Sequence, residues 1–143
     1  MKFVTLAALS SLALGVAACQ SEAEKQADAT EDALEQRADA GVAAADGSAV
    51  ALGMTERQLL DADLVSANGT ELGEVQALRR TGDQVSGEVT GLIVELENSN
   101  PDRYVTVPLQ GLTTRKDGND MDVQTALTAA ELAAMPDVQL PTT

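Results

Sequence analysis

Short apolar runs separated by turn signals fill the chain from about position 53 onward, a pattern typical of a small all-β domain. Residues 64–66 and 71–79 flank Asn68-Gly69, which predicts a hairpin because this dipeptide tolerates the positive φ angles of tight turns. A strand over 104–109 should lie at a sheet edge or carry a bulge, because Pro108 cannot donate to a ladder.

The longest predicted strand runs from about Gln84 to Leu96, and its apolar positions change parity on the way. Val85 and Val89 share one face, whereas the apolar residues after Gly91 fall on the other. A bulge or bend at Gly91 would return all of them to one interior, as at the corner of a small barrel.

Two capping-box spacings predict short helices at either end of this region. Thr55 and Gln58 open it with a single turn, and Thr128 and Glu131 begin a closing helix that should stop before Pro136.

The preceding segment, residues 21–50, has a different composition. It holds ten Ala, eight acidic residues, two basic residues and three larger aliphatic residues, too few to bury a core. We expect a frayed helix over 22–40 that ends near Gly41, followed by flexible chain that acts as an acidic spacer. A coiled coil would need more than Leu34 to form a seam.

The N-terminus reads as a secretory signal: Met1-Lys2 is followed by an apolar stretch, residues 3–18, that ends in small side chains. It is marginal for a membrane span, which needs about 20 apolar residues. Residues 16–19, Val-Ala-Ala-Cys, resemble a bacterial lipobox. That resemblance implies cleavage between Ala18 and Cys19 and acylation of Cys19. Several acyl chains would anchor the protein stably.

The residue after the lipid-bearing cysteine refines the expected location. In Gram-negative lipoproteins that resemble this one, Asp at that position favours retention in the inner membrane. The residue here is Gln20, so we expect a periplasm-facing envelope protein at the outer rather than the inner membrane.

Composition and charge narrow the chemistry. The chain has 143 residues, no His, no Trp, one Cys, one Tyr and one Phe, which excludes His-dependent catalysis, His-ligated metals and an internal disulfide. Its formal charge of -14 and its few aromatic side chains disfavour nucleic-acid binding. Residues 20–50 contribute -6 (eight acidic, two basic) and residues 51–143 contribute -9 (fifteen acidic, six basic).

Three segments carry a resemblance to the PRC-barrel family. Residues 59–75 resemble its opening Leu-rich turn, strand and Gly-x-Val strand, residues 104–109 its V-P-L strand, and residues 127–136 its closing helix. The match spans about residues 54–140 and implies a small, mostly antiparallel β-barrel used for protein binding and assembly, with no catalytic residues.

The expected fold class is therefore mainly β, a PRC-barrel-like barrel with a short C-terminal helix. The expected organisation is a signal peptide (1–18), a lipidated N-terminus with an acidic, disordered or partly helical tether (19–52), and the PRC-barrel-like domain (53–143).

Candidate binding residues are few. Tyr104 could anchor a partner, although packing on the barrel is favoured, and the basic pair Arg79-Arg80 could meet Arg115-Lys116 to receive an acidic partner. A turn rich in oxygen ligands could bind Ca²⁺ weakly, but Gly118 and Met121 break the EF-hand pattern, so no metal site is predicted. That turn consists of Asp117, Asn119, Asp120 and Asp122.

The sequence thus predicts a non-enzymatic envelope lipoprotein that binds a protein partner, meets the membrane through Cys19 and needs no cofactor. Two alternatives remain: an acidic cation-binding periplasmic protein, and a hydrolase that works with carboxylates alone.

Overall fold

The computed structural model describes residues 20–83 and 85–138, so the predicted signal segment and Cys19 lie outside the described residues. The α-helices of this part are α1 (Glu22–Ala44), α2 (Glu56–Leu60) and α3 (Ala129–Ala133), with a 3-10 turn at Thr81–Asp83. The strands are β1 (Ala49–Ala51), β2 (Met54–Thr55), β3 (Asp63–Val65), β4 (Glu71–Arg80), β5 (Val89–Leu96), β6 (Tyr104–Pro108), β7 (Thr113–Asp117) and β8 (Asp120–Gln124).

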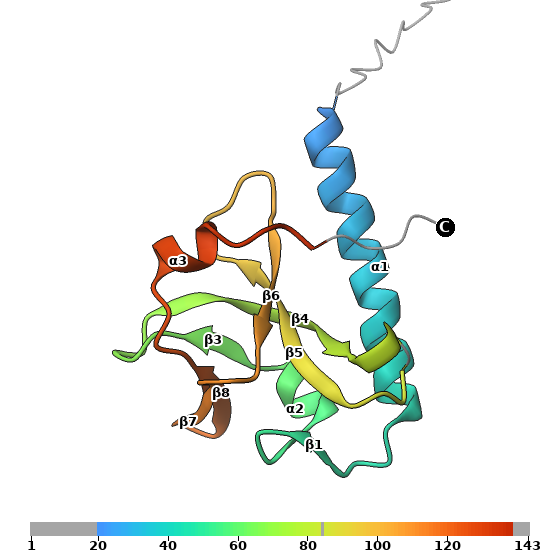
Figure 1. Ribbon diagram of the computed structural model, residues 1–143, viewed down its shortest axis with the longest axis vertical. Helices are drawn as coiled ribbons and strands as arrows, with labels where there is room; N and C mark the ends of the chain where they lie inside the picture. Colours follow the sequence, from blue (N-terminus) through green and yellow to red (C-terminus); the bar gives the residue numbers. More distant parts are fainter. Residues whose placement is uncertain (1–19, 84, 139–143) are drawn as a thin grey trace, which may run out of the picture.

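Six strands form one curved sheet in the order β6-β5-β4-β3-β8-β7, and β1 and β2 form a small separate ribbon (Figure 1). Every neighbouring pair is antiparallel except β3 with β8. The mainly β, mostly antiparallel prediction is confirmed. In the described part of the chain no ladder joins the outer strands β6 and β7, so closure into a barrel is not present in the hydrogen bonding.

The inner face of the sheet carries the main core, and the predicted bend near Gly91 is confirmed. Val89 is opposite Arg80 while Gly91 is opposite Arg79, so the register shifts by one residue at this point. The shift brings the apolar residues on both sides of it into one buried cluster: Val89, Leu92, Val94 and Leu96. The predicted start of this strand near Gln84 is wrong, because β5 begins at Val89 and residues 85–88 lie in the turn that precedes it. Val85 therefore lies outside the cluster that it was expected to join, with 38% of its surface exposed.

The predicted helix caps and the predicted turn at Asn68-Gly69 are also confirmed. Thr55 caps α2 and Thr128 caps α3, each with the reciprocal capping box predicted from its spacing. Gly69 adopts φ 85° in the turn between β3 and β4. β6 is an edge strand, as Pro108 requires.

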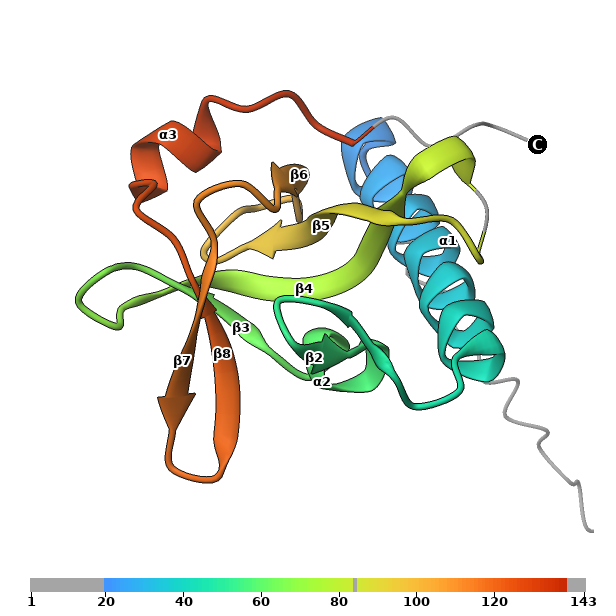
Figure 2. The same cartoon turned by 60° about the horizontal axis from the view of Figure 1, so that its bottom comes forward.

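Helix α1 differs from the predicted spacer. It runs unbroken from Glu22 to Ala44, capped by Ser21, and it lies along the outer face of the sheet beside β4 and β5 (Figures 1 and 2). Leu34 is only 1% exposed, so the Ala-rich helix buries its one large aliphatic side chain before Gly41 against the sheet. The expectation that this segment has nothing to bury is wrong.

The predicted helix end at Gly41 is also wrong, for a reason of packing. A Cβ at Gly41 would lie 1.9 Å from Oε1 of Glu56, so the glycine permits close approach to α2. The helix continues one turn beyond it.

The C-terminal segment closes the fold over β6. Arg103 donates from Nε to Asp137 at 2.8 Å and from its other nitrogens to the carbonyls of Ala133 and Met135. The Val138 amide donates to the Tyr104 carbonyl at 2.8 Å, which satisfies part of the edge that β6 would otherwise leave open.

Candidate functional site

The outer face of the sheet divides into a part covered by α1 and a part that faces solvent. Under the helix, Leu34 packs with Ala77 of β4, Ile93 of β5 and Tyr104 of β6, and Val138 borders them. Because the inner face buries its own cluster, the central strands β4 and β5 are covered on both sides where α1 crosses them. Helix α1 is thus a structural layer of the module.

A second contact fixes the C-terminal half of α1. Glu56, the first residue of α2, forms a 2.6 Å ion pair with Arg80 at the end of β4. The two side chains are 4% and 11% exposed, so this is a buried pair. Nη1 of Arg80 also donates to the Gly87 carbonyl at 2.8 Å. Gly41 of α1 lies directly over the Glu56 carboxylate.

Acidic residues stand opposite one another across the rest of this face. Glu74 on β4 is directly opposite both Asp63 on β3 and Glu95 on β5. The parallel register of β3 with β8 places Asp122 beside Asp63. We call these four residues the acidic row. Like charges in directly opposed positions destabilise a sheet, so the acidic row does not contribute to the stability of the strand pairing.

The electrostatics of the row follow from burial and proximity. Burial raises the pKa of Glu95, and neighbouring carboxylates add to the effect. Burial and the charge of Asp63 raise the pKa of Asp122. The charge of Asp63 is the main reason that the pKa of Glu71, next to the row, is also raised.

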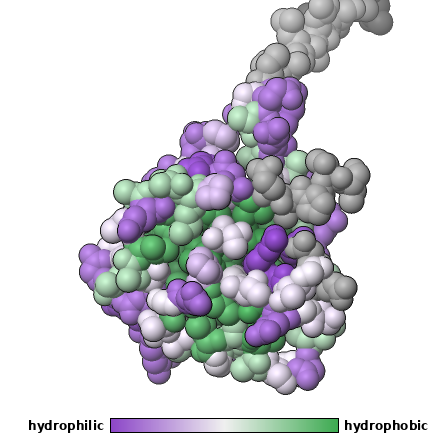
Figure 3. All heavy atoms as spheres, viewed as in Figure 1, coloured by the Kyte–Doolittle hydropathy of each residue, from purple (hydrophilic) through white to green (hydrophobic). Residues whose placement is uncertain are grey.

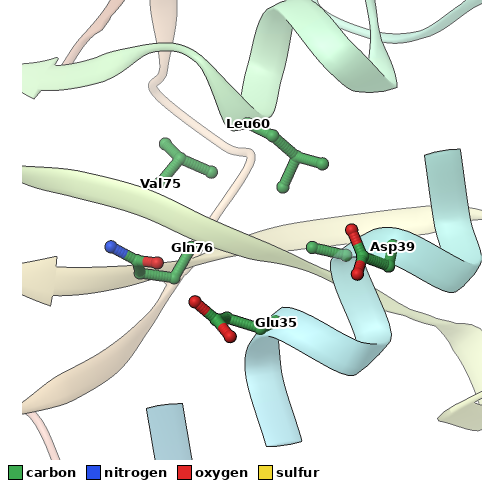
Figure 4. Close-up of a pocket in the computed structure, with 6 residues that line it drawn as sticks. Glu35, Asp39, Leu60, Val75 and Gln76 are labelled. Atoms are coloured by element: carbon green, nitrogen blue, oxygen red, sulfur yellow. The ribbon is translucent and has the colours of Figure 1, made fainter. Parts of the chain in front are cut away.

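An open cleft with a volume of about 360 Å³ lies between α1, α2 and β4. Its lining residues are Glu35, Ala38 and Asp39 of α1, Leu60 of α2, and Val75 and Gln76 of β4. Figure 4 shows the Glu35 side chain reaching toward Gln76, with Asp39 and Leu60 at the other end of the cleft. Nε2 of Gln76 donates to Oε2 of Glu95 at 2.9 Å, so the cleft adjoins the acidic row.

Tyr104 packs, as favoured from the sequence, but its hydroxyl is buried rather than at a rim. The residue is 3% exposed, and its Oη has no hydrogen-bond partner among the described residues. Burial raises the pKa of Tyr104, and the charges of Glu95 and Glu31 raise it further.

The basic pairs do not come together. Arg80 forms its ion pair with Glu56, and Arg79 also interacts with another group of the protein. Both lie on β4, and Arg115-Lys116 lies on β7, with β3 and β8 between them. The basic pairs therefore do not combine into one receiving surface for an acidic partner.

Three carboxylates lie close enough to share a cation, and they are not those of the predicted turn. Within residues 20–83 and 85–138, the carboxylate oxygens of Asp63, Glu71 and Glu74 lie within 4.8 Å of one another. Of the four oxygen-bearing residues in the turn at 117–122, only Asp122 is near this group, through its neighbour Asp63. A hollow of about 120 Å³ farther along is lined by Glu74, Glu95, Glu97 and Asp102 with residues of the 96–99 loop.

The residues that dock α1 were not recognised from the sequence, although two local signals exist. Ser21 and Glu24 have capping-box spacing, which marks a firm helix start at residue 22. Leu34 and Gly41 are seven residues apart, so they lie on one helix face. The acidic row had no such signal, because it depends on the register of four strands.

The chain matches no model of a protein family and no curated protein sequence. Of the helices in the described part, none is sufficiently long and apolar to cross a bilayer; α1 is long but acidic.

Proposed function

We propose that this chain is a bacterial envelope lipoprotein, acylated at Cys19, that presents a PRC-barrel-like module as a non-catalytic protein-interaction unit. It faces the periplasm, at the outer rather than the inner membrane, and needs no cofactor. The sequence supports binding over catalysis because it has no His and one aromatic residue after the signal segment.

The observation that carries the proposal is the continuity between the anchor position and the module. Helix α1 begins at Glu22, three residues after Cys19, and packs on the sheet through Leu34. Leu34 lies twelve residues after Glu22, which corresponds to about 18 Å of helix at 1.5 Å per residue. The first turns project beyond the body and carry mainly hydrophilic side chains (Figures 1 and 3). A lipid at Cys19 would therefore hold the module on a stiff stalk.

The finer fold assignment rests on order and composition. The Leu-rich turn α2, the β3–β4 hairpin, the β6 edge strand ending at Pro108 and the closing helix α3 follow one another as in the PRC-barrel resemblance. The interior is aliphatic, as expected for a small sheet filled by its own side chains.

Metabolic labelling with radioactive palmitate tests the anchor. We expect label on the wild-type chain expressed in a Gram-negative host and none on Cys19→Ser, which should leave the membrane fraction. A matched variant, Ser21→Ala, keeps Cys19 and should stay labelled. Labelling that is unchanged in Cys19→Ser would refute the lipoprotein assignment.

In-cell crosslinking followed by pull-down tests the interaction role. The wild-type chain should give discrete crosslinked species that Leu34→Asp, which exposes the outer face, loses or changes. A substrate screen against the same preparation examines hydrolase activity, and turnover that disappears in a carboxylate-to-Ala variant would overturn the non-catalytic assignment.

Cation binding stays as the alternative, and one observation favours it: the close approach of Asp63, Glu71 and Glu74. Oxygen ligands of this kind suit Ca²⁺. Calorimetric titration with CaCl₂ should give heat that Glu74→Gln abolishes and Glu88→Gln preserves. Absence of heat at millimolar Ca²⁺ would exclude this alternative.

A further inference from the structure

The cleft between α1, α2 and β4 combines an apolar wall with hydrogen-bond acceptors, two of them exposed carboxylates. Leu60 and Val75 supply apolar surface, and Ala38 adds a methyl group from the helix. Glu35 and Asp39 are four residues apart on α1, so their side chains lie on the same face, about 5–6 Å apart at Cβ. Both residues are exposed, so their carboxylates are accessible to a partner from the open side of the cleft.

Gln76 adds a third acceptor to this wall. Its Nε2 is used by Glu95, which leaves Oε1 as the free end of the amide. Figure 4 shows this oxygen on the side toward the Glu35 carboxylate. A group that donates hydrogen bonds and carries positive charge is favoured between these two acceptors.

The chemistry of the missing group follows from these features. It must donate several hydrogen bonds, carry positive charge and bring an apolar stem for Leu60 and Val75. An arginine side chain meets all three requirements, because its planar guanidinium donates in a fork that matches carboxylates and its methylene stem packs on apolar surface. A compact metal ion would leave the apolar wall unused.

We propose that this cleft receives an arginine side chain from a basic segment of a partner protein. This assignment rests on the proposed role as a protein-interaction module and names the partner's chemistry. The acidic row next to the cleft extends the negative field toward β3 and β8, so further basic residues of the same segment are attracted along the sheet.

Titration of the full mature chain, monitored by NMR, tests the assignment. The probe is a five-residue peptide, capped at both ends, with arginine in the centre, in about 150 mM salt, where the Debye length is about 8 Å. We expect saturable shifts of the Gln76 side-chain amide and the Ala38 backbone amide. The same peptide with citrulline in place of arginine keeps the shape without the charge and should leave both signals unmoved.

A charge-matched pair of variants separates the cleft from general attraction. Glu35→Gln with Asp39→Asn should weaken binding about fivefold, the size expected for two exposed ion pairs. Asp117→Asn with Asp120→Asn, at the distant β7–β8 turn, changes the net charge equally and should leave affinity unchanged. An equal loss in both pairs, the absence of a Gln76 shift, or the same shifts with CaCl₂ alone would overturn the proposal.

Failure of the cleft assignment and failure of the proposed function give different results. If the peptide fails to bind while crosslinking still yields discrete partners that depend on the outer face, only the cleft assignment is wrong. If crosslinking fails while the peptide binds as expected, the cleft binds arginine and the role in assembly is wrong.

Discussion

Gly41 leaves room for the Glu56 carboxylate, and this missing Cβ allows α1 to lie against α2. In an exposed helix a glycine costs about 1 kcal/mol relative to alanine. At residue 41 this cost of glycine is smaller than the cost of adding a methyl group, which would displace the Glu56 carboxylate that is buried and paired with Arg80. Single residues of this kind decide whether the N-terminal segment is a spacer or part of the module.

Gly41→Ala should therefore destabilise the protein, by about 1–3 kcal/mol as for other overpacked contacts. Urea unfolding of the wild type, both single variants and the double variant with Glu56→Ala gives a double-mutant cycle. Once Glu56 is removed, Gly41→Ala should become neutral or stabilising by up to about 1 kcal/mol. Equal effects of Gly41→Ala in both backgrounds would contradict the close approach.

Leu34→Ala should lower the free energy of unfolding by about 2–3 kcal/mol, at the lower end of the range for buried leucines, because Leu34 packs in the small cluster under α1 rather than in the main core. Val85→Ala serves as the control, because that side chain is 38% exposed and its loss should stay within about 0.5 kcal/mol. Denaturant unfolding of both variants provides the comparison.

Tyr104→Phe should be neutral or stabilising, because the Oη is buried without a partner and an unsatisfied hydroxyl costs about 1–3 kcal/mol. The raised pKa adds a pH signature. An ordinary tyrosine, as in the unfolded chain, ionises near pH 10. Because the pKa of Tyr104 is higher than this in the folded protein, folding favours the neutral phenol, and the free energy of unfolding falls as the pH rises above about 10. Absorbance at 295 nm reads this directly, since the chain has one Tyr and no Trp.

Elements differ in how far local signals specify them. The α2 and α3 caps, the β3–β4 hairpin and the register shift near Gly91 were all predicted, because each depends on residues close in sequence. Docking of α1 brings residue 34 into contact with residues 77, 93 and 104, which are distant in the sequence. The pattern of an Ala-rich segment does not predict such contacts. The acidic row likewise exists only once four strands have been aligned.

Repulsion between strands in the acidic row leads to a prediction for the stability of the sheet. Glu74 stands opposite two carboxylates, so Glu74→Gln should raise stability by about 0.2–1 kcal/mol at pH 7. The gain should shrink as pH falls toward 4: the raised pKa of Glu95 means that its proton binds more readily in the folded state, which relieves the repulsion there. Glu88→Gln, on an exposed loop, is the control in thermal unfolding at both pH values. A gain that is equal for the two variants would attribute the effect to net charge.

At the scale of the whole molecule, the central strands are buried on both faces where α1 crosses them, on one side against the sheet's own core and on the other against the helix. Helix and sheet should then unfold as one cooperative unit, which circular dichroism at 222 nm follows for α1 and the β-sheet amide I infrared band follows for the sheet. We expect coincident transitions in the wild type. Leu34→Asp places a charge in this contact, so α1 should melt first while the inner core holds. Separate transitions in the wild type would mean that α1 is a loose tether, and the stiff stalk between Cys19 and the module would have to be abandoned.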